Sequence, residues 1–403
     1  RSRITRLGVG VLVAGGLIGV AIPASAVSGF TAGDLVVYQV GGITSAASAV
    51  SLVEYGVSGL SATPSGFSVS LPTTDSLPTH ALVESGSALN DGELTLSADG
   101  TSLIATGYDA TVGTTSITSS KVPRTIAVVS STGTVDTSTS LTDSTVENNN
   151  FRSAAADSMP VSGSTLWTGS GGGLGVTTDG GTTTSNYLTA DKVHEVQIVG
   201  GQLYESTTKN INEIGTGLPT TGTPTDTALL SGANLTANFG PDQFAFVNLS
   251  GGSTPDTLYV ADGSNGATSG DPDAVEKYSL ESGVWTATGS ITVPLAVGLA
   301  VSVTGGVANI YVTGATATSA AANTVLYGIT DSSGFAGTLS GTATQLATAP
   351  TGSAFKGLAF SPVGTPGTGT PEVPLALVLP LGGGALLAGY VVYRRRYGTS
   401  PAA

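Results

Sequence analysis

Hydrophobic and polar positions alternate over short stretches of this chain, and one such stretch returns about six times. In each copy an aliphatic residue is followed by an aromatic or β-branched residue, with Gly, Asp or Asn close by. The copies lie several tens of residues apart, at 34–38, 102–106, 165–168, 202–205, 257–260 and 309–312. A period of this order is typical of a β-propeller or another repeat array.

Three further short strands accompany each copy. The strand before it is predicted at 92–97, 151–156, 194–199, 243–248, 297–303 and 354–360. The strand after it is predicted at 50–55, 125–130, 174–177, 210–214, 275–280 and 324–329. A weaker fourth strand is predicted at 67–71, 134–138, 186–189, 228–230, 284–288 and 344–348.

The strand at 354–360 has no partners after it, whereas three strands at the N-terminal side have none before them. We therefore predict an all-β fold, a six-bladed β-propeller closed by N- and C-terminal strands, which leaves no exposed sheet edge. Seven blades are the alternative, because the long segment 56–92 has room for extra strands. A pair of β-sandwiches is a weaker one.

Composition supports short strands and turns rather than helices. The 403 residues include 58 Gly, and only 10% are charged. The sequence has no Cys, so disulfides, thiol catalysis and thiolate metal sites are excluded for this sequence. Packing and sheet hydrogen bonds must stabilise the fold.

The net charge is −14, and six of the 13 basic residues lie near the two ends. The sequence between these ends contains 7 basic residues and all 27 acidic ones, so its net charge is −20. Such a surface repels phosphates, so we expect no nucleic-acid partner.

The first 26 residues have the three parts of a secretory signal peptide. Arg1, Arg3 and Arg6 are followed by an uncharged, mostly apolar stretch at 7–22 and by an Ala-Ser-Ala triplet at 24–26. This order is typical of an exported protein. We predict a signal peptide at 1–26 and an ectodomain at 27–363.

The C-terminal part predicts a membrane anchor. A Pro/Gly/Thr linker at 364–374 precedes an uncharged stretch at 375–393, and Arg394 to Arg396 follow at once. That length spans a bilayer, and positive charge stays inside. We predict a single-pass protein of the cell membrane with its ectodomain outside, as a monomer, and a cytoplasmic tail at 394–403. Bacterial surface-sorting tails carry an LPxTG or a Pro-Glu-Pro motif before the span. No LPxTG motif precedes the span here, and Pro371-Glu372-Val373-Pro374 departs from Pro-Glu-Pro. We therefore favour a transmembrane helix that is retained over a tail that a sorting enzyme cleaves.

Three structural motifs support a resemblance. Residues 33–41, 94–100 and 355–362 are similar to segments of a family of secreted bacterial surface proteins with propeller-like folds and C-terminal membrane or sorting tails. The resemblance covers roughly residues 28–363. It implies a fold and a place on the cell surface, and it carries over no catalytic residue.

Chemistry is harder to find. The chain has two histidines, His80 and His194, and no G-x-S-x-G elbow. Isolated histidines are usually structural, and zinc is not expected without Cys or a His pair. Glu147 and its neighbours up to Asn150, with Arg152, precede a first strand, so we expect them near the mouth of the channel.

The densest set of oxygen ligands lies in one loop: Asp262, Asn265, Asp271 and Asp273. Ca²⁺ prefers such oxygens, although the spacing is not that of an EF-hand. A polar turn between strands explains the same residues. We therefore expect no cofactor unless this loop binds Ca²⁺, which is the one candidate.

These observations favour a membrane-anchored bacterial surface propeller with a non-catalytic binding, adhesion or structural role towards an extracellular protein or glycan. The alternative is a secreted propeller hydrolase of glycans or phosphoesters that uses carboxylates and Ca²⁺. That alternative requires Asp and Glu side chains clustered at one mouth of the channel.

Overall fold

The computed structural model describes residues 29–143, 149–231, 239–263, 273–318 and 320–364. These residues form 25 β-strands and one 3₁₀ turn, η1 (Ile117–Ser119), and no α-helix among them. The all-β prediction is confirmed. Within the described ranges, no helix is long and apolar enough to cross a membrane. The predicted signal peptide (1–26) and anchor (375–393) lie outside these ranges.

Four sheets have four antiparallel strands each. The first two are built from β9 (Phe151–Ala155), β10 (Thr165–Ser170), β11 (Gly173–Thr178) and β12 (Asn186–Tyr187), and from β13 (Val193–Val199), β14 (Gln202–Thr207), β15 (Ile211–Ile214) and β16 (Asp226–Ala228). The other two are built from β17 (Pro241–Val247), β18 (Thr257–Asp262), β19 (Ala274–Glu281) and β20 (Val284–Thr292), and from β21 (Leu299–Thr304), β22 (Val307–Gly314), β23 (Val325–Asp331) and β24 (Thr344–Thr348).

The remaining strands form one nine-stranded sheet in the order β25-β1-β2-β4-β6-β7-β8, with β3 on β2 and β5 on β6. Its strands are β1 (Leu35–Val40), β2 (Ala47–Val57), β3 (Ala62–Ser70), β4 (Val83–Ser85), β5 (Thr95–Leu96), β6 (Ser102–Tyr108), β7 (Arg124–Ser130), β8 (Val135–Leu141) and β25 (Ala354–Phe360).

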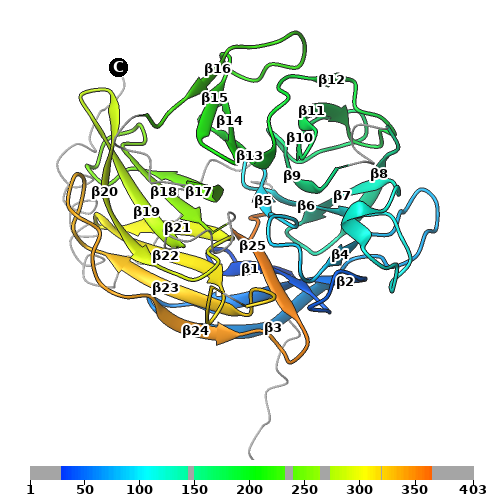
Figure 1. The fold of residues 1–403 in the computed structure, drawn as a ribbon, viewed down its shortest axis with the longest axis horizontal. Coiled ribbons are helices and arrows are strands. Elements are labelled where there is room, and N and C mark those ends of the chain that lie inside the picture. Colours follow the sequence, from blue (N-terminus) through cyan, green and yellow to red (C-terminus); the bar gives the residue numbers. More distant parts are fainter. Residues whose placement is uncertain (1–28, 144–148, 232–238, 264–272, 319, 365–403) are drawn as a thin grey trace, which may run out of the picture. The chain divides into compact units, whose positions relative to one another are not determined.

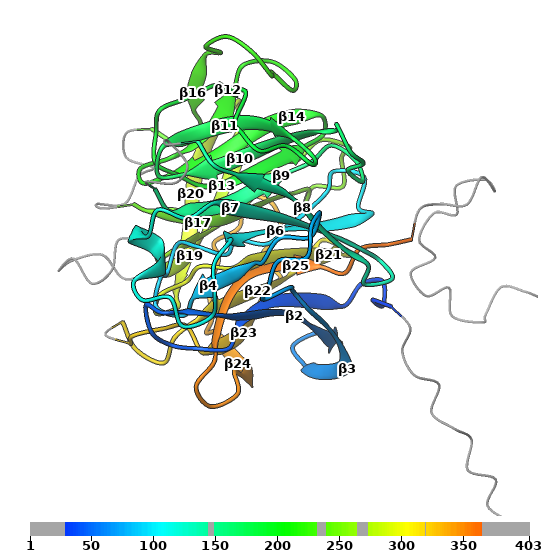
Figure 2. The same cartoon turned by 90° about the vertical axis from the view of Figure 1, so that its right-hand side faces the viewer.

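The sheets surround a central axis, as in a β-propeller (Figure 1). Strands β5, β9, β13, β17, β21 and β25 contact one another in a closed circle, and we call them the inner strands. In the perpendicular view, successive sheets follow one another from β3 and β24 at one edge to β12 and β16 at the other (Figure 2). The predicted first strands therefore line the channel.

Strand β25 pairs antiparallel with β1, from Leu35 opposite Phe360 to Val40 opposite Ala354. This confirms the prediction that a C-terminal strand completes the N-terminal sheet. Buried Phe355 and Leu358 pack with Leu35 in one cluster of the core. The pairing protects the edge of β1, which would otherwise offer free backbone groups to other chains.

Small residues allow the inner strands to approach closely. A Cβ atom on Gly357 would lie 2.2 Å from the backbone nitrogen of Leu94, and one on Gly298 would lie 2.5 Å from the carbonyl oxygen of Lys356. No real Cβ contact is this short. Glycine at these positions therefore keeps the channel narrow.

The segment 56–92 contains β3 and one strand that the sequence does not predict, the three-residue β4. Strand β4 links β2 to β6 and so joins two groups of four strands. Three residues are too few for a periodic signal. The structure places no further set of four strands in this segment.

Candidate functional site

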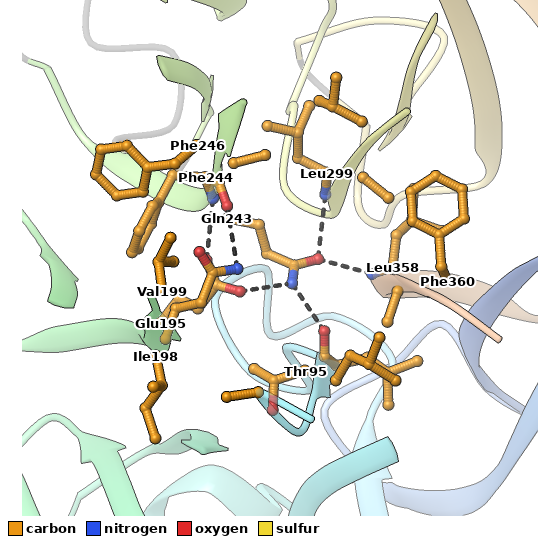
Figure 3. A pocket seen from close by; sticks show the side chains of 18 of the residues that line it. Thr95, Glu195, Ile198, Val199, Gln243, Phe244, Phe246, Leu299, Leu358 and Phe360 are labelled. Atoms are coloured by element: carbon orange, nitrogen blue, oxygen red, sulfur yellow. Dashed lines mark hydrogen bonds between the residues drawn. The ribbon is translucent and has the colours of Figure 1, made fainter. Parts of the chain in front are cut away.

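A cavity of about 260 Å³ opens in the channel, towards the C-terminal ends of the inner strands. Most of its lining residues are apolar (Figure 3), among them Phe244, Phe246, Leu299, Leu358 and Phe360, but polar groups form nearly half of the surface exposed to the cavity. Small-molecule sites are usually concave and combine apolar side chains with a small number of polar groups.

Gln243 crosses the channel and connects four segments (Figure 3). Its Nε2 donates to the carbonyl of Leu94 (2.9 Å) and to Oε1 of Glu195 (2.9 Å). Its Oε1 accepts from the backbone N–H groups of Leu299 (3.1 Å) and Leu358 (2.7 Å). Both donors and both lone pairs of the amide are used. The side chain of Gln243 is therefore held in one orientation across the channel.

Glu195 lies beside Gln243 and lines the cavity. It is 1% exposed, and its Oε2 accepts from the backbone N–H of Phe244 (2.9 Å). Burial raises its pKa from 4.5 to about 8, against the opposing effect of the Gln243 and Phe244 hydrogen bonds. This carboxyl therefore holds a proton at neutral pH and can exchange it near pH 8.

A charged layer lies at the opposite end, where the inner strands begin. Five of these strands have an ionisable residue within two positions of their first residue, and we call this set the channel ring: Glu93, Arg152, His194, Asp242 and Lys356. The backbone N–H of Glu93 donates to the carbonyl of Arg152 (3.0 Å), which ties the starts of β5 and β9 together.

The ring is closed to solvent. Glu93, Asp242 and Lys356 are 0% exposed, and His194 is 2% exposed. The side chain of Arg152 is 11% exposed. Burying this many ionisable groups is expensive unless they are paired.

Asp91 anchors one side of the ring. Its carboxylate accepts from the Tyr108 hydroxyl (2.6 Å) and from Nδ2 of Asn150 (2.9 and 3.0 Å). Nε of Arg152 lies 3.8 Å from its Oδ1. Asn150 and Arg152 thus both lie next to Asp91, whereas Glu147 and Asn148 lie outside the described residues.

Asp242 and His194 form a pair on the other side. Nδ1 of His194 lies 3.1 Å from Oδ1 of Asp242 and 2.8 Å from the carbonyl of Pro241. Nδ2 of Asn90 donates to the same carboxylate oxygen (3.2 Å). Burial raises the pKa of Asp242, while His194 acts in the opposite direction. A carboxylate that orients an imidazole is an arrangement suited to acid–base chemistry.

Glu84 and Glu93 have buried oxygens without partners. Both carboxyl oxygens of Glu93 and Oε2 of Glu84 have no hydrogen bond within the described residues. Burial, reinforced by nearby carboxylates, raises the pKa of each well above its usual range. Lys356 stands among them, donates to the Ala88 carbonyl, and has its pKa lowered by burial.

Another buried ion pair shows what a fully bonded arrangement looks like. Nζ of Lys277 lies 2.8 Å from Asp331 and also donates to the hydroxyl of Ser333 (3.0 Å) and to two carbonyl groups. The Tyr259 hydroxyl donates to the same Asp331 oxygen (2.5 Å). This ion pair joins the sheet of β19 to the sheet of β23. Among the described residues, every side-chain nitrogen and oxygen of the pair has a hydrogen-bond partner. The channel ring differs because its carboxylates remain underbonded.

The predicted Ca²⁺ loop is only partly described. Asn265 and Asp271 lie outside the described residues. Oδ1 of Asp262 accepts from the backbone N–H of Gly240 (2.9 Å), and Oδ2 of Asp273 accepts from that of Leu295 (2.8 Å). Both carboxylates are thus engaged with the backbone, and the Ca²⁺ site stays a prediction.

His80 lies outside the channel. Its Nδ1 is 2.9 Å from Oδ2 of Asp109, which also accepts from the hydroxyl of Ser140 (3.0 Å). Asp75 lies close enough for the three ionisable groups to surround an ion, but its Oδ1 already accepts from the Ala81 N–H (2.9 Å).

The sequence did not reveal the ring. An isolated histidine such as His194 predicts a structural role, and Asp242, Glu93 and Lys356 lie too far apart in the sequence to form a recognisable motif. One signal in the sequence could identify them: each lies within two residues of the start of a predicted first strand. Such positions share one end of a propeller channel once the strands are aligned.

Comparisons with known proteins assign no family to this chain. No known protein family and no curated protein matches the sequence. Similar solved structures include a protein from Lactobacillus plantarum, with 12% identity, a TM-score of 0.43 and coverage of 77% of this chain and 82% of that one. A gluconolactonase from Xanthomonas campestris has 9% identity, a TM-score of 0.38 and coverage of 80% and 87%. The β-propeller domain of a Myceliophteria thermophila protein has 10% identity, a TM-score of 0.33 and coverage of 59% and 82%. At these TM-scores none of them assigns an activity.

Proposed function

We propose that this protein is a hydrolase of glycans or phosphoesters that works through the carboxyl groups of the channel ring. The observation behind this proposal is the clustering of Glu93 and Asp242 around Lys356 at one end of the channel. Hydrolysis by acid–base chemistry needs two groups of different protonation in one site. Scattered carboxylates would have offered no such pair.

Glu93 is assigned as the acid, since burial and the charges of Asp242 and Glu195 all raise its pKa and favour its protonated form. It gives its proton to the leaving oxygen. Asp242 is assigned as the base that accepts a proton from the attacking water, since His194 and Asn90 stabilise its ionised form and oppose the rise in its pKa that burial causes. Lys356 and Arg152 place positive charge where negative charge develops. Lys356 thus supplies the charge that Ca²⁺ was predicted to supply, and no step requires a metal.

The buried ring sets a further requirement. Because Glu93, Asp242 and Lys356 are 0% exposed, a substrate reaches them only if this end of the channel opens. Backbone hydrogen exchange at the starts of β5, β17 and β25 should therefore change when a substrate is added.

The test is turnover of 4-nitrophenyl glycosides and 4-nitrophenyl phosphoesters by the full-length protein. We expect Glu93→Gln and Asp242→Asn to lower kcat by about 100-fold or more, with the melting temperature measured to verify folding. Glu213→Gln, on β15 and outside the ring, is the control and should retain full activity. No turnover by the wild type, or unchanged turnover in both ring variants, would refute the proposal.

A non-catalytic binding protein is the second candidate. The apolar cavity lined by Phe246, Leu299 and Phe360 favours it, because this cavity is separated from the ring by the fully bonded Gln243. Binding of an extracellular apolar or glycan ligand there would need no catalysis. Saturable binding that Phe246→Ala abolishes, with no turnover of any substrate, would select this candidate.

We further propose that the protein is exported and anchored in the cell membrane by residues 375–393, as a monomer with its ectodomain outside. The supporting evidence is the sequence alone. Residues 1–26 have the order of a signal peptide, and the uncharged stretch at 375–393 is long enough to span a bilayer and is followed by Arg394 to Arg396. Protease treatment of intact cells should release the ectodomain, and alkaline washing should leave the anchored chain in the membrane.

We propose that the propeller has six blades. In this interpretation the nine-stranded sheet is two blades, β25-β1-β2-β3 and β5-β6-β7-β8, which β4 links at their outer side. The four separate sheets supply the others. Six inner strands in a closed circle support this count.

A further inference from the structure

Three carboxyl groups from separate elements meet on the sheet formed by β13 to β16, away from the channel ring. Asp191 lies in the connection between β12 and β13, Glu205 lies on β14, and Asp226 lies on β16. One oxygen from each carboxyl lies within 4.8 Å of the others. Asp191 and Asp226 are exposed, whereas Glu205 is buried.

Glu205 is the unusual member of this group, which we call the acidic triad. It is 0% exposed. Its Oε2 accepts from the hydroxyl of Thr189 (3.2 Å), but its buried Oε1 has no hydrogen-bond partner of ordinary geometry among the described residues. An unpaired buried carboxylate oxygen costs free energy that a native fold normally avoids. One of the two carboxylate oxygens of Glu205 lies within 4.8 Å of the other two carboxyl groups, so this buried side chain is part of the cluster.

The electrostatics of the triad are unfavourable without a cation. Burial, followed by the charge of Asp226, raises the pKa of Glu205 to about 8, although Thr189 and Asn212 act in the opposite direction. Burial and Asp191 raise the pKa of Asp226 to about 6. Like charges at this distance disfavour one another.

Protein cations do not neutralise the triad. Lys192 and Lys209 line a depression of about 470 Å³ together with Asp191 and Asn212. Across the described ranges, neither lysine forms an ion pair with any of the three carboxylates. The depression gives solvent, and therefore dissolved ions, access to the exposed side of the triad.

We propose that Asp191, Glu205 and Asp226 bind a divalent cation, with Ca²⁺ as the ion that fits the ligand chemistry best. All three ligands are carboxylate oxygens, and the Thr189 hydroxyl and Asn212 amide lie beside them. Hard cations prefer such a set, and water completes the six to eight ligands that Ca²⁺ takes. The site differs from the loop of Asp262 and Asp273.

The cation has a structural role at this position. Strand β16 has only three residues, all of them exposed, and it pairs with β15 alone. A cation held by Asp226 would fasten this edge strand to β14 and to the connection before β13. Cation binding should therefore stabilise this sheet by mass action.

The experiment is calorimetric titration of Ca²⁺ into the full-length protein after treatment with EDTA, at pH 7.5, with melting temperatures in parallel. We expect one saturable event that releases protons, detected as different heats in two buffers of different ionisation enthalpy. Glu205→Gln should weaken it at least about 10-fold. Asp226→Asn, an exposed change that leaves the core intact, should weaken it by a similar factor.

Two controls separate this site from others. Glu213→Gln, a carboxylate of the same sheet outside the triad, should bind as the wild type does. Asp262→Asn reports on the predicted loop site and should leave the triad event unchanged. The proposal is overturned if the wild type shows no saturable binding of Ca²⁺, or if both triad variants bind as the wild type does.

Discussion

Gln243 connects four segments of the channel through its single amide group. Replacing it with leucine leaves the N–H groups of Leu299 and Leu358 buried without acceptors, and Glu195 loses a donor. Each such group costs about 1–3 kcal/mol. We therefore expect Gln243→Leu to lower the free energy of unfolding by at least about 3 kcal/mol in urea denaturation.

Gln197 is the matched control for this residue. It lies on β13 next to the same cavity, is half-buried, and makes one long hydrogen bond, 3.4 Å from its Nε2 to the carbonyl of Phe244. Gln197→Leu should cost less than about 1 kcal/mol. If the two variants lose the same stability, the four bonds of Gln243 do not hold the channel together.

Strand β25 closes the circle of sheets, because it pairs with β1 at the other end of the chain. A chain that ends before Ala354 loses the whole pairing with β1 and the buried side chains of Phe355 and Leu358. The exposed edge of β1 then offers free backbone groups. We expect this truncated chain to aggregate or to lack a cooperative unfolding transition, as checked by size-exclusion chromatography and thermal melting.

A circular permutant provides the control for this truncation. It joins Val363 to Gly29 through a short linker and opens the chain in the exposed loop between Gly251 and Gly252, so every strand is kept. The backbone N–H of Ser361 donates to the carbonyl of Asp34 (2.8 Å), which shows that the segments before β1 and after β25 are adjacent. The permutant should fold. A well-folded truncated chain would contradict the role of β25.

Most strands can be predicted from the sequence, whereas the channel ring that these strands position cannot. The strand predicted at 354–360 coincides with β25, and the one at 151–156 differs from β9 by one residue, because alternation and turn residues act locally. Strand β4 was missed since only its pairing with β2 and β6 defines it. The contact of Asp242 with His194 depends on how two neighbouring sheets pack, which no local pattern encodes.

For the whole molecule, buried carboxyl groups make stability depend on pH in an unusual direction. The pKa of Glu195 and that of Glu205 are each raised from 4.5 to about 8 in the folded state. Between these values the folded chain holds protons that the unfolded chain has released. The free energy of unfolding is therefore highest below pH 4.5 as far as these groups are concerned, and it decreases as the pH rises through about 8.

This decrease should amount to roughly 1 kcal/mol per pH unit for each of the two groups, before the protein relaxes around them. Asp99, Asp256 and Asp331, whose pKa values are lowered, act below their ordinary value of 3.8 and leave this window unaffected. Urea denaturation at pH 5.5, 6.5 and 8.0 in EDTA should show stability falling, and Glu205→Gln should flatten the slope while Glu213→Gln keeps it. Stability that rises over this range would mean that these carboxyl groups are ionised and paired in the folded protein. Adding Ca²⁺ in place of EDTA should remove the contribution of Glu205, because a cation bound to the acidic triad takes the place of its proton.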